Sequence, residues 1–558
     1  MFAIFTIAVL LVYGAIFVMR AVNEWSVADR QRKAAQAYYV TEAGSESGLE
    51  KLDEFINMDL LTTISSMNPQ KVGQKAVKAV SSADGLNFLA EMVPDMILNA
   101  DGTEASYENT GTNFGAGNFS YDIVVSEKSD PVVVAQDMWD FPFNYKIETA
   151  GAVAGTSKTI SLLGDFTVRV QRDNFAKYAL FTVHHGTPSG GTVWFTDGTN
   201  FAGPIHTNER FSYAGNSSLA GLAGIFNGTT TQHLSKARYY NYGSPIFSSA
   251  DANGTRDVPV FNADQQKGYS EIVLASSVQK QDLYEQALGS QTPSSGSGID
   301  IANDGSTLIG GIYVDGDATI EMGMDGDDNA QYTITHDGTT KIITVDIDAD
   351  QTSVETVGDS IVTYTGQPKG QDDLGTIIYV NGSVTSLKGT VQRDTEVTVS
   401  CENDAVIQGN ILYSDYTSAS GSPGDEDYVP PNAEDAVNLL GVVSWGGNIR
   451  IGTSAPNNIN IHGILMARGG MFTVDGYDDY GGSRGTATLL GGVITEFYGP
   501  FGLFNGYTGE QLSGYGRDFN YDSRTQMGKS PPYFPTLKTF IGFTNDLTDQ
   551  VVYWEGAY

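Results

Sequence analysis

The chain has 558 residues, 40% of them hydrophobic, so it is long enough to form more than one packed unit. Asp and Glu number 66 against 31 Lys and Arg, and the resulting formal net charge of −35 repels phosphate backbones and argues against nucleic acid as a partner. The single cysteine, Cys401, excludes an intramolecular disulfide and a CxxC zinc or haem motif.

The N-terminal stretch MFAIFTIAVLLVYGAIFVM, residues 1–19, carries no charge. A helix rises about 1.5 Å per residue, so this stretch comes close to the thickness of a bilayer's hydrocarbon core, about 30 Å. A cleaved secretory signal would show a basic start, a shorter apolar run and an A-x-A-like site. These features are not clear here, and we expect the segment to remain in the working protein.

The helical pattern continues beyond this stretch, because no proline occurs before Pro69. We predict a hydrophobic N-terminal helix and stalk over residues 1–58, which is longer than a membrane crossing requires. Such a helix suits packing against copies of itself, and small residues such as Ala28, Ala37 and Gly44 would allow close approach. A single-pass, membrane-anchored surface protein with a helical stalk is the alternative.

The segment AQAYYVTEAGSESGLEKLDEF, residues 35–55, is similar to the stretch that follows the hydrophobic helix of minor-pilin-like proteins. GPIHTN at 203–208 and GYGRDFNYDSRTQMGKSPPYFPTL at 514–537 resemble elements of large, uncharacterised pilin-like proteins with a β-rich body. This type IV pilin-like resemblance implies removal of a short leader and extraction of the helix from the inner membrane into a filament. Type IV pilins usually carry Glu at the fifth mature position, where this chain has Phe5.

We therefore expect a structural subunit of a type IV pilus-like extracellular filament, without catalytic function. Its partners would be copies of itself in a helical filament, and the inner membrane before assembly. Its final location would be an extracellular filament or the cell surface. A filament-tip protein or adhesin is an alternative, because 29 tyrosines and 26 phenylalanines give aromatic surface suited to glycan or surface contacts.

The expected fold class is a long N-terminal α-helix plus a mainly-β body, because 65 glycines and 18 prolines favour turns over further helices. Residues 59–118 are predicted to form short helices interrupted by Pro69 and Pro94, with a Gly/Asn/Thr loop at 101–119. Residues 119–290 are predicted to form a β-rich, pilin-like domain, since segments such as NFSYDIVVSE alternate apolar and polar residues. We expect its antiparallel sheet to pack against the lower stalk.

Residues 291–558 contain short apolar segments separated by Gly, Asn and Asp, such as TIIYVNGSVTSLKGTV. Short strands with Gly or Asn at each corner cannot bury an apolar face alone, so we predict a β-helix or related solenoid-like domain. A β-sandwich is the alternative. The Pro- and aromatic-rich stretch 531–535 is predicted to cap an open end of this domain. The predicted core residues are Ile407, Ile411, Ile461, Ile464, Leu489 and Val493.

Acidic turns are the candidate site for a bound ion. Carboxylates on Gly-rich turns supply the oxygen ligands that Ca²⁺ prefers, although the spacing here does not match an EF-hand loop. The carboxylates are Asp315, Asp317, Asp325, Asp327 and Asp328. Solvated acidic loops are the alternative, and we expect no other cofactor.

No set of residues has the spacing of a catalytic motif. His206 in the GPIHTN element lacks a neighbouring base, nucleophile or metal ligand, so we expect it to bond to a turn. His184 and His185 are adjacent on a predicted strand and would point to opposite faces. β-Helices also host polysaccharide-acting enzymes, and an active site here would require five dispersed residues to converge. These residues are Asp415, Arg450, His462, Arg468 and Asp475.

Overall fold

The computed structural model divides into two compact units. Unit 1 comprises Met1–Arg172 and Lys538–Tyr558, and unit 2 comprises Asp173–Leu537. This division differs from the four predicted ranges, because strands within 180–267 pair with strands within 482–520 and so join the same sheet. The structure describes residues 2–67, 69–135, 138–196, 199–214, 222–241, 244–249, 258–275, 277–293, 298–416, 437–479, 481–503, 511–526, 529–544 and 548–555.

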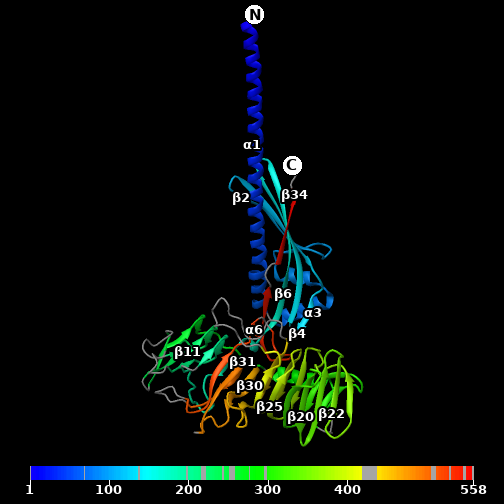
Figure 1. Cartoon of the computed structure of the whole chain (residues 1–558), viewed down its shortest axis with the longest axis vertical. Helices are drawn as coiled ribbons and strands as arrows, with labels where there is room; N and C mark the ends of the chain where they lie inside the picture. Colours follow the sequence, from blue (N-terminus) through cyan, green and yellow to red (C-terminus); the bar gives the residue numbers. More distant parts are fainter. Residues whose placement is uncertain are drawn as a thin grey trace. The chain divides into compact units, whose positions relative to one another are not determined.

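A long N-terminal helix opens unit 1, as predicted (Figure 1). Helix α1 (Phe2–Glu54) has 53 residues, which corresponds to about 80 Å. It continues through a π-helical turn, η1 (Phe55–Leu60), into α2 (Leu61–Ser66), so the helical run passes the predicted end at residue 58. Two shorter helices follow, α3 (Pro69–Ser82) and α4 (Gly85–Met92).

The sheet of unit 1 has the strand order β1–β2–β3–β5–β6–β33, with β4 paired to β5 and β34 paired to β6. The pairings from β1 to β6 are antiparallel, and β3, β5 and β6 lie largely in the part of the body predicted to form an antiparallel sheet. The strands are β1 (Ile97–Leu98), β2 (Ala105–Phe114), β3 (Gly117–Glu127), β4 (Val132–Ala135), β5 (Met138–Val153), β6 (Thr156–Asn174), β33 (Thr536–Thr544) and β34 (Thr548–Glu555).

The predicted loop at 101–119 is wrong, because β2 lies within it and pairs with both β1 and β3. Most of β2 is exposed, and its Gly, Asn and Thr residues face solvent. An exposed strand has no need of apolar residues on both faces, so its composition resembles that of a loop.

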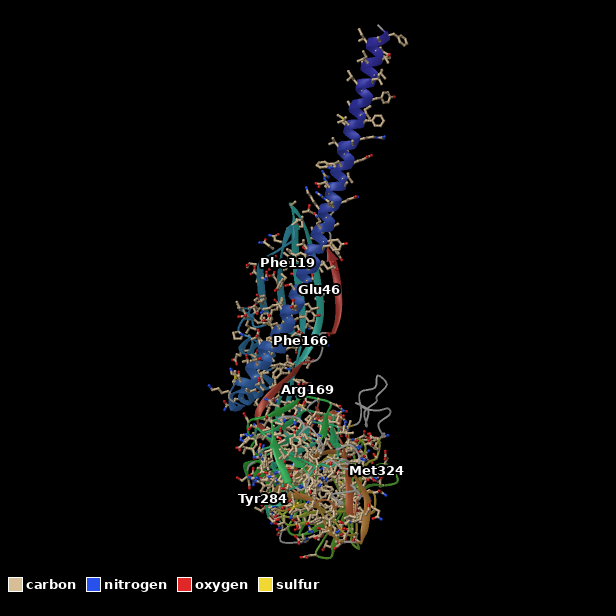
Figure 2. The ribbon with its side chains drawn as sticks, turned by 90° about the vertical axis from the view of Figure 1, so that its left-hand side faces the viewer. Glu46, Phe119, Phe166, Arg169, Tyr284 and Met324 are labelled. Carbon is tan, nitrogen blue, oxygen red and sulfur yellow. The ribbon has the colours of Figure 1, made fainter. Side chains whose placement is uncertain are left out.

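The lower part of α1 packs on this sheet. Its buried residues recur at intervals of one, three or four, which is one face of a helix. They are Ala37, Val40, Thr41, Gly44, Ser45, Gly48 and Leu52. Figure 2 labels Phe119 of β3 and Phe166 of β6, whose side chains belong to the same buried core as this face of the helix.

Unit 2 is built on a 23-stranded sheet in which parallel pairings dominate (Figure 1). One parallel series, here called the first series, runs β18–β24–β26–β28–β30–β31–β7–β9–β12–β16. Two other parallel series accompany it, β19–β25–β27–β29–β30 and β31–β32–β8–β11–β15. The long strands β30 and β31 take part in more than one series.

The strands of the three series are β7 (Leu180–His184), β8 (Asn200–Phe201), β9 (Ile205–Thr207), β11 (Leu222–Phe226), β12 (Thr230–Gln232), β15 (Val258–Phe261), β16 (Gln265–Lys267), β18 (Leu308–Val314), β19 (Ala318–Met324), β24 (Thr376–Val380), β25 (Val384–Val391), β26 (Glu396–Cys401), β27 (Ala405–Tyr413), β28 (Leu439–Ser444), β29 (Ile449–Ile451), β30 (Asn460–Val474), β31 (Gly482–Tyr498) and β32 (Ser513–Asn520). Antiparallel strands extend the sheet beyond β18 and β19. They are β17 (Ile299–Asn303), β20 (Ala330–His336), β21 (Thr339–Asp346), β22 (Gln351–Thr356) and β23 (Ile361–Thr365). A separate small sheet contains β10 (Ser212–Tyr213), β13 (Ala237–Asn241) and β14 (Ser244–Ser248).

The order of these strands in space differs from their order in the sequence. Within this sheet, the strands between β7 and β16 in the sequence lie on one side of β31, and those between β17 and β30 lie on its other side. The chain passes from the first group to the second through helix α5 (Ser277–Leu288), which the sequence patterns did not predict. Its Tyr284 ring packs edge-on against Tyr313 of β18 and Tyr379 of β24, with centroids 5.6 Å and 5.5 Å away.

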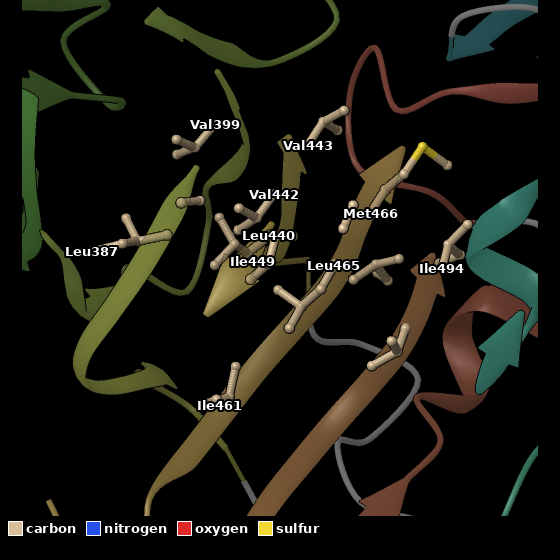
Figure 3. Packing of buried hydrophobic residues seen from close by; sticks show 14 of the residues in the cluster. Leu387, Val399, Leu440, Val442, Val443, Ile449, Ile461, Leu465, Met466 and Ile494 are labelled. Carbon is tan, nitrogen blue, oxygen red and sulfur yellow. The ribbon is translucent and has the colours of Figure 1, made fainter. Parts of the chain in front are cut away.

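The core of unit 2 lies between the parallel series. Figure 3 shows part of it, with Leu387 of β25, Val442 of β28 and Leu465 of β30 among the buried side chains. All six predicted core residues are at most 1% exposed, which confirms the prediction for these positions. They lie on β27, β30 and β31, where the chain returns to the core after each Gly- or Asn-containing corner.

The stretch 531–535 does not lie over the terminal strands of the first series, as the predicted cap would. It crosses three internal strands of that series instead. Pro532 O accepts a hydrogen bond from the Thr398 hydroxyl of β26, and a Cβ atom on Gly441 of β28 would lie 2.8 Å from the Phe534 ring. A Cβ atom on Gly375, just before β24, would lie 2.7 Å from the Pro532 ring. Glycines thus give this segment room to cover the side of the sheet.

Candidate membrane and assembly interface

The beginning of α1 forms an apolar surface that the chain itself leaves uncovered. Every residue from 2 to 25 is exposed, including Phe5 at 70%, Leu10 at 65% and Phe17 at 69%. Among the described residues, this helix is the one long and apolar enough to cross a membrane. A helix that is apolar on every face is typical of a segment surrounded by lipid or by other protein. We call residues 2–25 the exposed segment.

Charged and aromatic residues occur at the end of the exposed segment. Arg20 is the first charged residue after the N-terminus of the sequence, and Trp25 is 73% exposed. Trp and Arg favour the interface between hydrocarbon and water, where the apolar part of each side chain meets lipid and the polar part meets water. Asp29 then pairs with Arg32 and Lys33, each at 2.7 Å, so charged side chains are grouped on the helix just after the exposed segment.

The later part of the helical run, residues 37–66, is called the packed segment because the sheet of unit 1 covers one of its faces. A Cβ atom on Gly44 would lie 2.6 Å from the Thr149 side chain, and one on Gly48 would lie 2.8 Å from another side chain of β5. Ala37 is fully buried in the same core. Ala37 and Gly44, predicted to permit contact between copies, are therefore used within unit 1.

Small residues of the exposed segment remain available for contact with other molecules. A Cβ atom on Gly14 would meet no atom of the described residues within 4 Å, and Ala8 is exposed. Farther along, Ala28 is also exposed. Small residues on an apolar helix allow another helix to approach closely, because they leave the backbone accessible.

The five predicted calcium ligands form two groups rather than one. Asp315 and Asp317 follow β18, whereas the other three residues follow β19. The seven-residue strand β19 lies between the two groups and spans about 20 Å, so one ion cannot contact both. Within the described residues, no group of three His, Cys, Asp or Glu side chains is placed to hold a metal ion. A calcium site at either turn stays a prediction.

Protein donors already occupy several of these carboxylates. Asp315 accepts a hydrogen bond from Asn381 Nδ2 at 2.9 Å, and Asp317 accepts one from Ser383 N at 2.7 Å. Asp325 accepts hydrogen bonds from the Asn329 side chain and from the backbone N–H groups of residues 327 and 329. The bond from the Asn329 side chain, followed by the two backbone bonds, lowers the pKa of the Asp325 carboxyl group. Asp325 therefore holds its own turn in place, and Asp315 and Asp317 bind the corner between β24 and β25.

His206 of the GPIHTN element is a buried structural residue. Its Nδ1 lies 2.8 Å from Thr231 Oγ1 and its Nε2 lies 2.9 Å from Asn208 Oδ1. Burial lowers its pKa to about 4, so the ring is neutral near pH 7. Asn208 in turn bonds to the backbone of Ile272, in the segment that leads to α5. The element thus fastens this connecting segment to β9.

The five residues of the hypothetical polysaccharide-acting site do not converge. Arg450 Nη1 lies 2.8 Å from Asp475 Oδ1, but the guanidinium also pairs with Asp404, which the sequence did not suggest. His462 is buried and accepts a hydrogen bond from the backbone of β27. Arg468 donates to the backbone of Ala275, and Asp415 accepts a hydrogen bond from Asn438. One pair of the five is brought together, and it is a structural ion pair.

Comparison with known protein families gives a match over part of the chain. Residues 140–224 match the family model described as a domain of unknown function, DUF4900. The match extends from β5 of unit 1 through β11 of unit 2 and includes the GPIHTN element. No curated protein and no solved structure matches the chain.

Proposed function

We propose that this chain is a structural subunit of a type IV pilus-like extracellular filament, inserted in the membrane through α1 before assembly. The observation that carries the proposal is the exposed segment, whose residues 2–19 are uncharged and apolar on every face and which belongs to the same helix as the start of the packed segment. Inside a filament, equivalent segments of neighbouring copies would cover one another. The apolar surface would leave lipid without meeting water.

The length of the helix supports assembly over simple anchoring. A bilayer needs about 20 apolar residues, whereas α1 has 53. The packed segment fixes the remainder of the helix rigidly to the sheet, so the direction of the exposed segment is set with respect to unit 1. A flexible tether would be sufficient for an anchor, but regular packing of many copies requires a defined geometry.

We further propose that unit 2 is a β-solenoid, because its three parallel series place strands from successive chain segments in register. In a solenoid each coil contacts only its neighbours, and the outer faces remain available for contacts with other molecules. Such a body suits a surface-exposed part of a filament subunit, a filament-tip protein or an adhesin. We assign it no catalytic role.

A single-pass, membrane-anchored surface protein is the second candidate. The observation that favours it is the membrane-length apolar helix near the N-terminus. The two candidates share membrane insertion and differ in whether copies of the exposed segment pack against one another. An experiment must therefore separate insertion from packing.

Two variants make this separation in cells that carry the full chain. Ala8→Arg with Gly14→Arg should abolish both membrane insertion and filaments, because each arginine at the centre of a bilayer costs about 3 kcal/mol. Gly14→Leu should preserve insertion and abolish filaments, because it keeps the segment apolar but fills a position of close approach. Val12→Leu, at an exposed apolar position, is the matched control.

Sheared surface material is examined by negative-stain microscopy, and the membrane fraction is measured by immunoblot. Filaments of normal thickness in both the Gly14→Leu strain and the arginine double variant would refute the filament proposal. A chain that never forms filaments but fractionates with the membrane would support the anchored surface protein instead. Mass spectrometry of the N-terminus of the sheared material would also define any processing.

A further inference from the structure

Unit 2 contains a polar cavity of about 430 Å³ that none of the functions above uses. It lies where β7 ends, beside the loop 186–192 and the start of the small sheet formed by β10, β13 and β14. This volume is within the range of small-molecule sites, about 300–1,000 Å³. The side chains that matter for the argument are His185, Glu209, Arg210, Ser212 and Arg238.

Two arginines line this cavity without a carboxylate partner. The guanidinium carbons of Arg210 and Arg238 lie 4.8 Å and 5.4 Å from the centre of the Phe247 ring, which places both cations over one aromatic side chain. Within the described residues, neither arginine forms an ion pair with Asp or Glu. Arg238 donates a hydrogen bond to the Thr192 hydroxyl. Burial and the charge of Arg210 lower the pKa of Arg238, and the charge of Glu209 raises it by a smaller amount.

This pairing of like charges is unusual for the chain, in which acidic residues outnumber basic ones 66 to 31. Two neighbouring guanidinium groups repel each other, and a bound anion, in addition to the Glu209 carboxylate, would reduce that repulsion. The fork geometry of arginine suits a carboxylate in particular, because two parallel N–H groups can contact its two oxygens.

The same cavity also offers a fixed acceptor. Glu209 Oε2 accepts a hydrogen bond from the backbone N–H of His185 at 3.0 Å, and Oε1 lies 3.0 Å from His184 Nδ1. These contacts hold the carboxylate in place while its side chain remains 44% exposed. Its free lone pairs can accept hydrogen bonds from hydroxyl groups, and its charge disfavours multiply charged anions such as phosphates.

His185 supplies a buried polar group in the cavity wall. Its side chain is 4% exposed, and neither ring nitrogen has a hydrogen-bond partner among the described residues. The ring is fixed by stacking on Tyr498 and by edge contacts with Phe195 and Phe211. Both ring nitrogens are inaccessible to solvent, so His185 forms a rigid part of the cavity wall and does not contact the ligand.

We propose that this cavity binds a hydroxylated carboxylate, such as an acidic sugar. The carboxylate contacts Arg210 and Arg238, and hydroxyl groups of the ligand contact Glu209 and Ser212. A neutral sugar lacks the group that the arginines require. An anion without hydroxyl groups has no donor for the free lone pairs of Glu209.

Isothermal titration calorimetry on the full-length protein in detergent tests this proposal with defined probes. We expect D-glucuronate to bind at least about 10-fold more tightly than D-glucose, which has the same ring without the carboxylate. Lactate is a third probe that distinguishes the source of the ligand. Tighter binding of glucuronate than of lactate indicates an acidic sugar, and equal binding indicates a free hydroxy acid.

Variants of the two arginines connect the binding to the cavity. Arg238→Gln and Arg210→Gln should each weaken glucuronate binding about 10-fold or more. If the Arg238→Gln protein fails to fold, because Arg238 is half-buried, the Arg210→Gln protein alone provides the test. Arg393→Gln, at an exposed arginine of the same unit, is the matched control and should bind like the unaltered protein. The proposal is overturned if glucuronate fails to bind at millimolar concentration, if glucose binds equally well, or if both cavity variants bind normally.

Discussion

The two segments of the N-terminal helix differ in what surrounds them, although they belong to one continuous helical run. In the exposed segment every residue is accessible, and apolar side chains occur on all faces. In the packed segment a stripe of buried residues faces the sheet, and polar residues such as Glu46 and Glu50 are exposed on the other side (Figure 2). The first pattern fits an apolar environment on all sides, and the second fits a helix at the surface of a folded domain.

Glycine shows the difference most directly. Gly14 in the exposed segment has space around it within the described chain, whereas Gly44 in the packed segment is in contact with Thr149 and Phe119. The fold therefore requires glycine at position 44, whereas nothing within the described chain requires it at position 14. A requirement for glycine at position 14 would have to come from a partner outside this chain.

The largest expected difference between the segments concerns phenylalanine. Phe55 is fully buried, with its ring centre 5.0 Å from that of Tyr107, whereas Phe17 is 69% exposed. Phe55→Ala should destabilise unit 1 by about 3–5 kcal/mol, because it removes buried apolar surface and leaves a cavity. Phe17→Ala should leave the stability of unit 1 unchanged.

The free energy of local opening of β5, from amide hydrogen exchange on the full-length protein in detergent, measures this difference. Exchange in the strands of unit 2 serves as an internal control. Equal losses of protection for the two variants would contradict the division of the helix into an exposed and a packed segment.

A smaller difference is expected at the two glycines. Gly44→Ala should destabilise unit 1 by about 1–3 kcal/mol, because the new methyl group would lie 2.6 Å from the Thr149 side chain. Gly14→Ala should be neutral or stabilise the helix by up to about 1 kcal/mol through its higher helix propensity. The same exchange measurement reports both effects. A stable Gly44→Ala variant would show that the helix can move away from β5.

Local sequence patterns were sufficient to predict the long N-terminal helix and several core residues of unit 2. The uncharged N-terminal stretch and the absence of proline before Pro69 predicted the long helix, and apolar runs between corners predicted core residues such as Ile411 and Val493. The pairing of Val493 with Leu180 could not be predicted, because a strand's hydrophobic period does not identify a partner hundreds of residues away.

The candidate binding sites show the same limitation. The carboxylates of residues 315–328 are close in sequence, but an intervening strand separates them, so spacing alone suggested one cluster where there are two. Arg210 and Arg238 are far apart in the sequence but lie beside the same Phe247 ring. Parallel pairing of β10 with β13 places Ser212 beside Arg238, and this long-range contact has no signal in the sequence around either arginine. The sequence predicted only that His185 and His184 point to opposite faces of a strand, and the place of His185 in a cavity wall depends on the fold.

The smallest expected effect compares two threonines whose hydroxyl groups bond to the helix backbone. Thr6 Oγ1 donates to Phe2 O in the exposed segment, and Thr41 Oγ1 donates to Ala37 O at 2.7 Å in the packed segment, with Lys158 O of β6 at 3.3 Å. Thr41→Val should destabilise unit 1 by about 1 kcal/mol, since the fully buried hydroxyl is removed from its acceptors while the side chain keeps its shape. Thr6→Val should have no effect on unit 1, because that hydroxyl has no contact with the sheet among the described residues. Hydrogen exchange of β6 measures both variants, and a Thr41→Val protein with unchanged protection would show that the hydroxyl adds nothing to the contact between the helix and the sheet.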